Sequence, residues 1–230
     1  MTRDRPAFGA RRLHTLLQRD GLRINHKQVR RLYLEEGLQF KPRRRRRRAA
    51  TVRQPRAFVS APTERWATDF MHDVLATEQH ARVFTLIDVY SRECVALEVE
   101  RSFSGTDVAR LLSDVGDRAG HSPAIVQCDK GTEFPSTALD HWACWNRMQL
   151  DFSRPGKPVD NSVCEAFNGW LGRECLTRYW FASLAEAQTE LSTWRADYNN
   201  VRPHARLGLQ SPAQFRASRD QPASVATLRN

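Results

Sequence analysis

The chain has 230 residues, a formal net charge of +10, and 40% hydrophobic residues with six Trp. That is enough apolar sequence to build a core, so a wholly disordered chain is excluded. The sequence has no apolar run of 18 residues, which excludes a membrane span, and no signal peptide, which excludes a secreted precursor. It has five Cys but no C-x-x-C pair, which excludes a zinc knuckle and favours reduced thiols.

The charge is divided unevenly along the chain. Residues 1–62 carry 18 basic and four acidic side chains, a formal charge of +14. Residues 63–230 carry 18 basic and 22 acidic side chains, a formal charge of −4. A basic front of this kind predicts contact with a polyanion, and leaves the rest of the chain free to gather carboxylates for another purpose.

The first predicted elements are two short helices between residues 9 and 37. Gly21 can close the first helix, Asn25 can cap the start of the second, and Gly37 can end it. Apolar residues recur at helical spacing in both, first Leu13, Leu16 and Leu17, then Val29, Leu32 and Tyr33. Two short helices joined by a tight turn are typical of a helix-turn-helix.

A generic helical hairpin with a solvated basic face is the alternative to a DNA-binding unit. The +14 front favours nucleic-acid binding over that alternative. The side chains expected to contact DNA from these two helices are Arg11, Arg12, His26, Lys27, Arg30 and Arg31.

A basic linker follows, over residues 41–62. Its six adjacent arginines repel one another, so the segment cannot fold alone and is expected to meet phosphates. These are Arg43, Arg44, Arg45, Arg46, Arg47 and Arg48. A merely solubilising or targeting tract is the alternative.

From residue 65 onward the pattern predicts strands and then helices. Three β-rich runs, at 65–74, 81–91 and 93–100, suit an antiparallel meander. An amphipathic helix capped by Ser104 follows, and then a buried strand that ends at Cys128. A helix is expected over 135–146, followed by a short strand and a helix over 161–172. The capping box of Ser183 and Glu186 opens one more helix. This order implies an α/β fold, with a mixed sheet flanked by helices.

Three carboxylates stand at unusual places in these elements. Asp69 lies inside the first strand, where Asp is normally depleted, Asp129 directly follows the buried strand, and Glu165 lies in the helix over 161–172. Helical phase places Glu165 away from the predicted apolar stripe of that helix, together with Asn161, Asn168 and Gly172. The stripe itself consists of Val163, Ala166, Phe167, Trp170 and Leu171.

Chemistry gives these carboxylates a reason to converge, since Mg²⁺ is typically held by a few carboxylates, water and substrate phosphate. Asp73 and Asp88 also lie in strand-like runs, and they compete for the same interpretation. The chain lacks both G-x-x-x-x-G-K-[ST] and G-x-G-x-x-G, which argues against nucleotide hydrolysis.

Five motifs in order resemble those of the transposases of bacterial insertion sequences, specifically the second-reading-frame proteins of insertion sequence family three. They are "FGARRLHTLLQRDGLRINHKQVRRLYLEEGL", "WATDF", "CDKGTEF", "DNSVCEAFNGWLGREC" and "YNNVRPHARLGLQSPAQF". The 35 residues between Asp129 and Glu165 match the D-D-35-E spacing of that family. The resemblance spans about residues 5–216.

The resemblance implies an RNase H-like fold with a retroviral-integrase-like core, in which Asp69, Asp129 and Glu165 bind two Mg²⁺ ions, or Mn²⁺ in their place. It implies cleavage and transfer of DNA strands at transposon ends and into a target. It also implies a homo-multimer on double-stranded DNA, a separate upstream-frame helix-turn-helix subunit, and a cytoplasmic location. In the core, the expected DNA contacts are Lys157, Asn161, Asn168 and Arg173.

The domains expected from the sequence are a helix-turn-helix-like region over 1–40, the linker over 41–62, an RNase H-like core over 63–205, and a tail with a short helix over 206–230. Two departures from the family keep a second function open. The family has a basic residue seven positions after its glutamate, where this chain has Gly172, and Met1 lies only seven residues before Phe8. The alternative is therefore a transposase remnant that binds DNA without cutting it.

Overall fold

The computed structural model describes residues 5–39, 59–120, 122–129, 136–153 and 161–220. The chain divides into two compact units, Met1–Val59 and Ser60–Asn230. Each unit is described by itself.

The N-terminal unit contains helices α1 (Ala10–Arg19) and α2 (His26–Glu35). Its small core consists of Phe8, Leu13, Leu16 and Val29. The predicted caps are confirmed. The Asn25 side chain accepts a hydrogen bond from the Lys27 backbone, and Gly21 and Gly37 have positive φ just past the two helix ends. Leu32 is 41% exposed, although its spacing placed it with the buried Val29.

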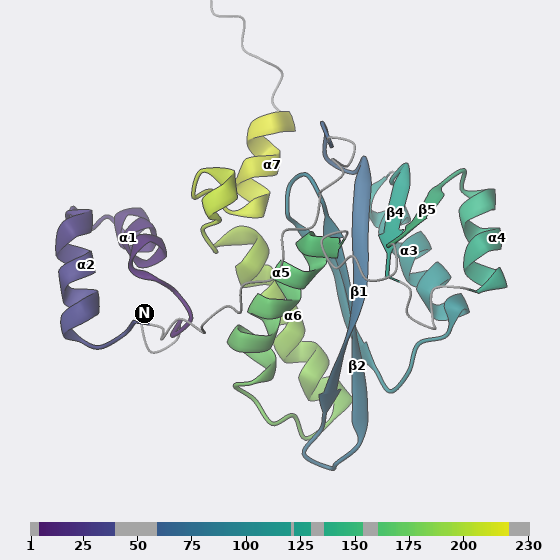
Figure 1. The fold of residues 1–230 in the computed structure, drawn as a ribbon, viewed down its shortest axis with the longest axis horizontal. Coiled ribbons are helices and arrows are strands. Elements are labelled where there is room, and N and C mark those ends of the chain that lie inside the picture. Colours follow the sequence, from purple (N-terminus) through teal and green to yellow (C-terminus); the bar gives the residue numbers. More distant parts are fainter. Residues whose placement is uncertain (1–4, 40–58, 121, 130–135, 154–160, 221–230) are drawn as a thin grey trace, which may run out of the picture. The chain divides into compact units, whose positions relative to one another are not determined.

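The C-terminal unit is built on a five-stranded mixed sheet in the order β3-β2-β1-β4-β5 (Figure 1). The predicted meander forms its antiparallel part, and the two short strands pair in parallel beside β1. The expected mixed α/β sheet is therefore confirmed. The strands are β1 (Arg65–Val74), β2 (His80–Asp88), β3 (Cys94–Glu100), β4 (Ile125–Cys128) and β5 (Gln149–Phe152).

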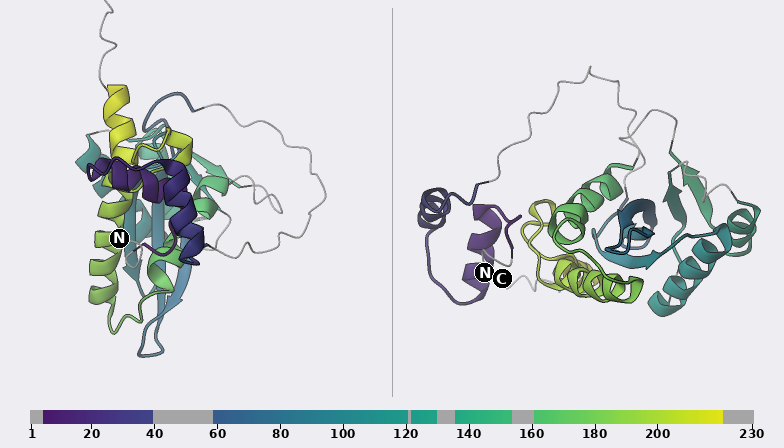
Figure 2. Two further views of the ribbon diagram at one scale, coloured as in Figure 1. Left: turned by 90° about the vertical axis from the view of Figure 1, so that its left-hand side faces the viewer. Right: turned by 90° about the horizontal axis from the view of Figure 1, so that it is seen from below.

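Helices cover both faces of the sheet, and each face has its own core (Figures 1 and 2). One face carries α3 (Gly105–Ala119) and α4 (Thr137–Trp145). The other carries α5 (Ser162–Leu171), the π-helical turn η2 (Gly172–Leu176) and α6 (Leu184–Asn200). The short η3 (Ala205–Leu207) and α7 (Pro212–Asp220) follow.

The helix over 161–172 differs from its prediction in phase and in length. Its buried side chains are Cys164, Phe167 and Leu171, whereas Ala166 is exposed. The predicted stripe was therefore rotated, because the small thiol of Cys164 packs against the sheet as an apolar group. The chain also does not leave the helix at Gly172 but continues through the π-helical turn to Leu176.

None of the helices in the described ranges is long and apolar enough to cross a membrane.

Candidate active site

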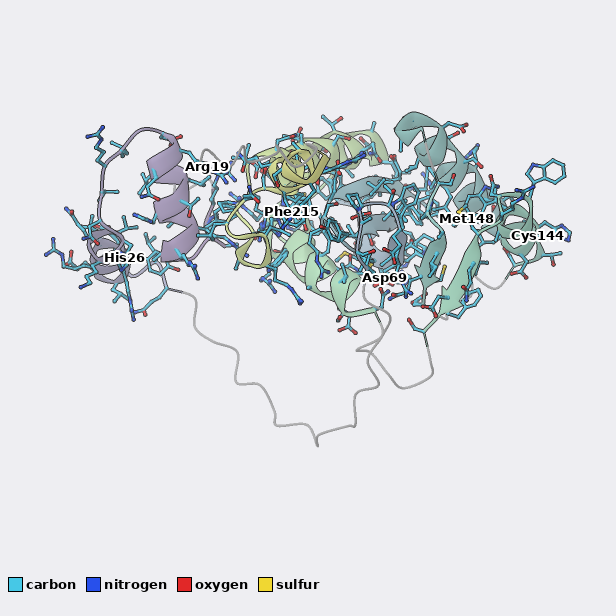
Figure 3. The ribbon with its side chains drawn as sticks, turned by 90° about the horizontal axis from the view of Figure 1, so that it is seen from above. Arg19, His26, Asp69, Cys144, Met148 and Phe215 are labelled. Carbon is cyan, nitrogen blue, oxygen red and sulfur yellow. The ribbon has the colours of Figure 1, made fainter. Side chains whose placement is uncertain are left out.

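The site forms where β1 and β4 separate. Their parallel pairing ends at Ala67 and Gln127, and the two aspartates follow, Asp69 within β1 and Asp129 just after β4. Side chains alternate between the faces of a strand, so Asp69 faces the same side as Ala67 and Met71. Both of those residues pack in the core beneath α5, and Figure 3 shows Asp69 beside that helix.

The carboxylate of Asp69 is held by two hydrogen bonds. Its own neighbour Phe70 donates the backbone N–H to Oδ1 at 2.9 Å, and Asn168 of α5 donates Nδ2 to Oδ2 at 2.8 Å. The Oδ1 of Asn168 is buried and accepts no hydrogen bond from the described residues. Asn168 is half-buried, and its amide is directed to Asp69 on β1.

The pKa of Asp69 is raised to about 6, first by burial and then by the negative charges of Asp129 and Glu165. A hydrogen bond between the Asp69 and Asp129 carboxyls has the same effect, while the Phe70 N–H opposes it. The electrostatics thus couple all three predicted carboxylates.

The three carboxylates do not make a closed metal cage. Glu165 is exposed on α5. No group of three His, Cys, Asp or Glu side chains in the described part of the chain is placed to hold a metal ion. Asp69 and Asp129 form a close pair, and Glu165 is their neighbour on the facing helix.

Asn161 lies beneath the site rather than on its surface. The side chain is 6% exposed, its Nδ2 donates to the Thr68 carbonyl at 3.2 Å, and its Oδ1 accepts from Gln127 Nε2 at 3.1 Å. The expectation that Asn161 points outward is therefore wrong, because both ends of its amide are engaged inside the protein. Gln127, a polar residue within a buried strand, was the one signal in the sequence that this network exists.

Arg173 occupies the face of α5 that carries Glu165. Its guanidinium Nη1 lies 3.5 Å from the point where a Cβ on Gly169 would stand, so the side chain folds back over the glycine, one turn toward Glu165. Gly172, the position that is basic in the family, instead faces Met71.

Asp88 and Asp73, which compete with the three carboxylates for the metal-ligand interpretation, have different hydrogen-bond partners. Asp88 is 2% exposed, and its carboxylate accepts hydrogen bonds from the backbone of Thr63 and from the backbone and hydroxyl of Ser91. It therefore stabilises a turn. Asp73 lies near the far end of β1 and accepts a hydrogen bond from the Val74 backbone.

The predicted DNA contacts of the N-terminal unit are mostly exposed. Arg11, His26, Lys27, Arg30 and Arg31 are solvent-exposed. Arg12 is half-buried, with its guanidinium 5.6 Å from the centre of the Phe8 ring. Arg43 to Arg48 and Lys157 lie outside the described residues.

The thiols carry no chemistry in this site. Cys128 is buried at the end of β4, and burial raises the pKa of its thiol well above the ordinary range. The thiol of Cys164, also fully buried, is affected in the same way.

The "YNNVRPHARLGLQSPAQF" segment is held to the π-helical turn after α5 by a buried ion pair, the Arg202–Glu174 clamp. Arg202 is 1% exposed and pairs with Glu174 of the π-helical turn. Its guanidinium lies 4.8 Å from the centre of the Trp170 ring and 5.7 Å from that of Tyr198. No sequence signal identified this role, because an arginine in a polar segment is normally exposed.

Three family models match the chain. An HTH-like domain matches residues 1–46, and two integrase core domain models match residues 59–158 and 146–212.

Relatives from insertion elements align over almost the whole chain. An uncharacterized 31.7 kDa protein of insertion element IS407 from Burkholderia multivorans is 39% identical, over 99% of this chain and 83% of the relative. An uncharacterized 39.2 kDa protein of IS476 from Xanthomonas euvesicatoria is also 39% identical, over 95% of this chain and 63% of the relative. The putative transposase InsK of IS150 from Escherichia coli is 25% identical, over 93% of this chain and 78% of the relative.

Solved structures share the fold at low sequence identity. A chain of the simian T-cell lymphotropic virus intasome, in complex with a regulatory subunit of PP2A, has a TM-score of 0.61 at 14% identity, over 88% of this chain and 69% of that chain. The HTLV-2 integrase catalytic core domain in complex with magnesium has a TM-score of 0.54 at 12% identity, over 68% of this chain and 97% of that chain. These likenesses confirm an integrase-core fold.

Proposed function

Because this chain belongs to the insertion-sequence transposases with an HTH-like domain and an integrase core, we propose that it cuts and joins DNA strands at the ends of an insertion sequence in a divalent-metal-dependent reaction. The observation that carries this proposal is the close pair of Asp69 and Asp129 at the point where β1 and β4 separate, with Glu165 near enough on α5 to raise the pKa of Asp69.

The side chains at this point suit a hard divalent cation. Carboxylate oxygens are the ligands that Mg²⁺ prefers, and burial followed by the neighbouring carboxylates raises the pKa of Asp69, so a bound cation would stabilise its charged form. The buried Oδ1 of Asn168 is an open hydrogen-bond acceptor next to Asp69, which suits the water that Mg²⁺ usually retains. Asp69 and Asp129 would hold the cation, with Glu165 as the third ligand, and Mn²⁺ can replace Mg²⁺.

Two such ions, when bound, would activate the attacking oxygen and stabilise the leaving oxygen of a phosphodiester. In the first step water attacks the phosphodiester at the element end and frees a 3′-hydroxyl. In the second step that hydroxyl attacks a phosphodiester of the target, forming one bond as another breaks. No covalent bond between protein and DNA forms in either step.

The remaining side chains would orient the carboxylates or bind the DNA. Asn168 fixes the Asp69 carboxylate through its hydrogen bond. Arg173 reaches back over Gly169 and takes the place of the basic residue that the family carries at the position of Gly172, where it would meet a DNA phosphate. The N-terminal unit and the arginine-rich linker would position the chain on the duplex.

The proposed assembly is a homo-multimer that brings two element ends together, alone or with an upstream-frame helix-turn-helix subunit. Since the substrate is chromosomal DNA, the place of action would be the bacterial cytoplasm, with the protein held on the nucleoid through DNA.

A nicking and strand-transfer assay on element ends with Mg²⁺ tests the function. We expect Asp69→Asn and Asp129→Asn to reduce cleavage below detection while leaving duplex binding intact, because each removes a proposed ligand charge. Asp73→Asn is the matched control, on the same strand, and we expect it to cleave at the wild-type rate. Cleavage by Asp129→Asn at the wild-type rate would exclude the assigned site, and wild-type protein that binds ends without cutting would favour the DNA-binding alternative.

A further inference from the structure

The backbone pairing of β1 and β4 stops before it reaches the acids. The two strands are in register over three residue pairs, of which Ala67 and Gln127 are the last. Asp69 and Asp129 therefore stand just past the last residue pair of the ladder, and no backbone pairing between β1 and β4 reaches them. Something other than the ladder must set the distance between these two residues.

The side chain of Asn161 occupies this junction. Its Nδ2 donates to the carbonyl of Thr68, the residue before Asp69, at 3.2 Å. Its Oδ1 accepts from the amide of Gln127, two residues before Asp129, at 3.1 Å. Asn161 also directly precedes α5, four residues before Glu165. A single amide thus links the three elements that carry the three carboxylates.

The helix start is consistent with this role. Asn at an N-cap position normally accepts a hydrogen bond from a backbone N–H of the first turn, which stabilises the helix start. Asn161 stands at the N-cap of α5 but makes no such bond, since its amide is directed to the strands instead. Asn161 and its two partners are deeply buried, with exposed fractions of 6% for Asn161, 0% for Thr68 and 4% for Gln127.

We propose that Asn161 and Gln127 are positioning residues for the carboxylate cluster. Their amides replace the missing backbone ladder, and set the separation of Asp69 and Asp129 and the placement of Glu165 above them. This inference rests on the proposed function, because it takes the three carboxylates to bind a divalent cation.

Mn²⁺ binding to the full chain, followed by the electron paramagnetic resonance signal of free Mn²⁺, tests the proposal without turnover. Asn161→Leu keeps the branching of the side chain, Gln127→Met keeps its length, and neither adds a charge, while both remove the hydrogen bonds. We expect each variant to bind Mn²⁺ about 10- to 100-fold more weakly, the range typical of groups that orient metal ligands.

Asn199→Leu is the matched control. Asn199 is 9% exposed and makes two hydrogen bonds to the backbone of Cys94, at 2.8 and 3.0 Å, so it links α6 to β3 by the same chemistry. We expect it to lower the melting temperature about as much as Asn161→Leu and to leave Mn²⁺ affinity within about twofold of wild type. An equal loss of affinity in this control, or wild-type affinity in both test variants, would overturn the proposal.

Asp69→Asn in the same assay separates this proposal from the proposed function. If Asp69→Asn loses Mn²⁺ binding while Asn161→Leu and Gln127→Met keep it, only the positioning role is wrong. If Asp69→Asn binds Mn²⁺ as wild type does, the carboxylate site is wrong and both proposals fall. Should Asn161→Leu fail to fold, Gln127→Met decides the question, because it leaves the bond to the Thr68 carbonyl in place.

Discussion

Asp69 is an acid in the middle of a ten-residue strand, where its surroundings favour the protonated form. Burial comes first among the causes that raise its pKa to about 6, followed by the charges of Asp129 and Glu165. The hydrogen bond from Asn168 holds the carboxylate in place without removing this repulsion. A cation would remove it, so the same residue links metal binding to the stability of the fold.

The metal-free protein should lose stability as pH rises from about 4 to about 6. An acid whose pKa is raised by folding binds its proton more tightly in the folded state, so its contribution is fully present below the unfolded pKa and lost above the folded one. The difference between 3.8 and about 6 corresponds to at most about 3 kcal/mol.

Thermal unfolding across this pH range, in the presence of a chelator, measures the effect. The Asp69→Asn variant should not lose stability over this pH range, and it should be more stable than wild type at pH 7. Parallel pH curves for the two proteins would show that Asp69 does not carry the effect.

At the scale of the element, α5 and the π-helical turn η2 that continues it carry Glu165, Gly169 and Arg173 at intervals of four residues. Because Gly169 has no side chain, the Arg173 guanidinium can lie across it. We propose that Arg173, one position further on, supplies the basic side chain that Gly172 lacks.

Gly169→Leu should displace Arg173 and weaken cleavage as much as Arg173→Ala does, and combining the two changes should cost little more than either alone. Comparing cleavage rates of the three variants checks this. Gly172→Ala is the control, since its added Cβ would meet only the Met71 methyl group at 3.7 Å and its φ is helical. Additive losses in the double variant would contradict the coupling of Gly169 to Arg173.

The buried pair of Arg202 and Glu174 ties the segment after α6 to the π-helical turn that follows α5. Arg202→Met should cost about 3–5 kcal/mol in the free energy of unfolding, because it leaves the buried carboxylate of Glu174 without its partner. Arg202→Met combined with Glu174→Gln should recover part of that loss. Urea unfolding measures both, and a loss below about 1 kcal/mol in the single variant would argue against the clamp.

At the scale of the whole molecule, a basic front precedes a mildly acidic body, and we assign phosphate contact to the front. Replacing Arg43 to Arg48 by Gln should weaken binding to all duplexes alike and reduce the salt slope by as much as about 5, because each phosphate contact contributes about 0.9. Salt titrations of DNA binding measure the slope.

Arg110→Gln with Arg118→Gln serves as the control for this experiment. Both residues are exposed on α3, which lies on the sheet face opposite α5. We expect an unchanged slope from this pair. An unchanged slope in the six-residue variant as well would exclude the tract as a DNA contact.

The sequence by itself predicted the elements and singled out the three acids that we propose as metal ligands. Alternating and helical periodicities predicted each strand and helix of the core, because those periods reflect which residues face the interior. Asp69 stood out because acids are depleted in strands, and Asp129 because it ends a buried one. The 35-residue spacing to Glu165 added the family resemblance.

Only the tertiary structure decided which side chains contact one another between these elements. The phase of α5, the inward amide of Asn161, the return of Arg173 over Gly169 and the burial of Arg202 all depend on residues distant in the chain. Periodicity cannot tell an asparagine that caps a helix from one that joins two strands, because both stand at the same position in the sequence. The difference arises from the partners that the fold brings within hydrogen-bonding distance.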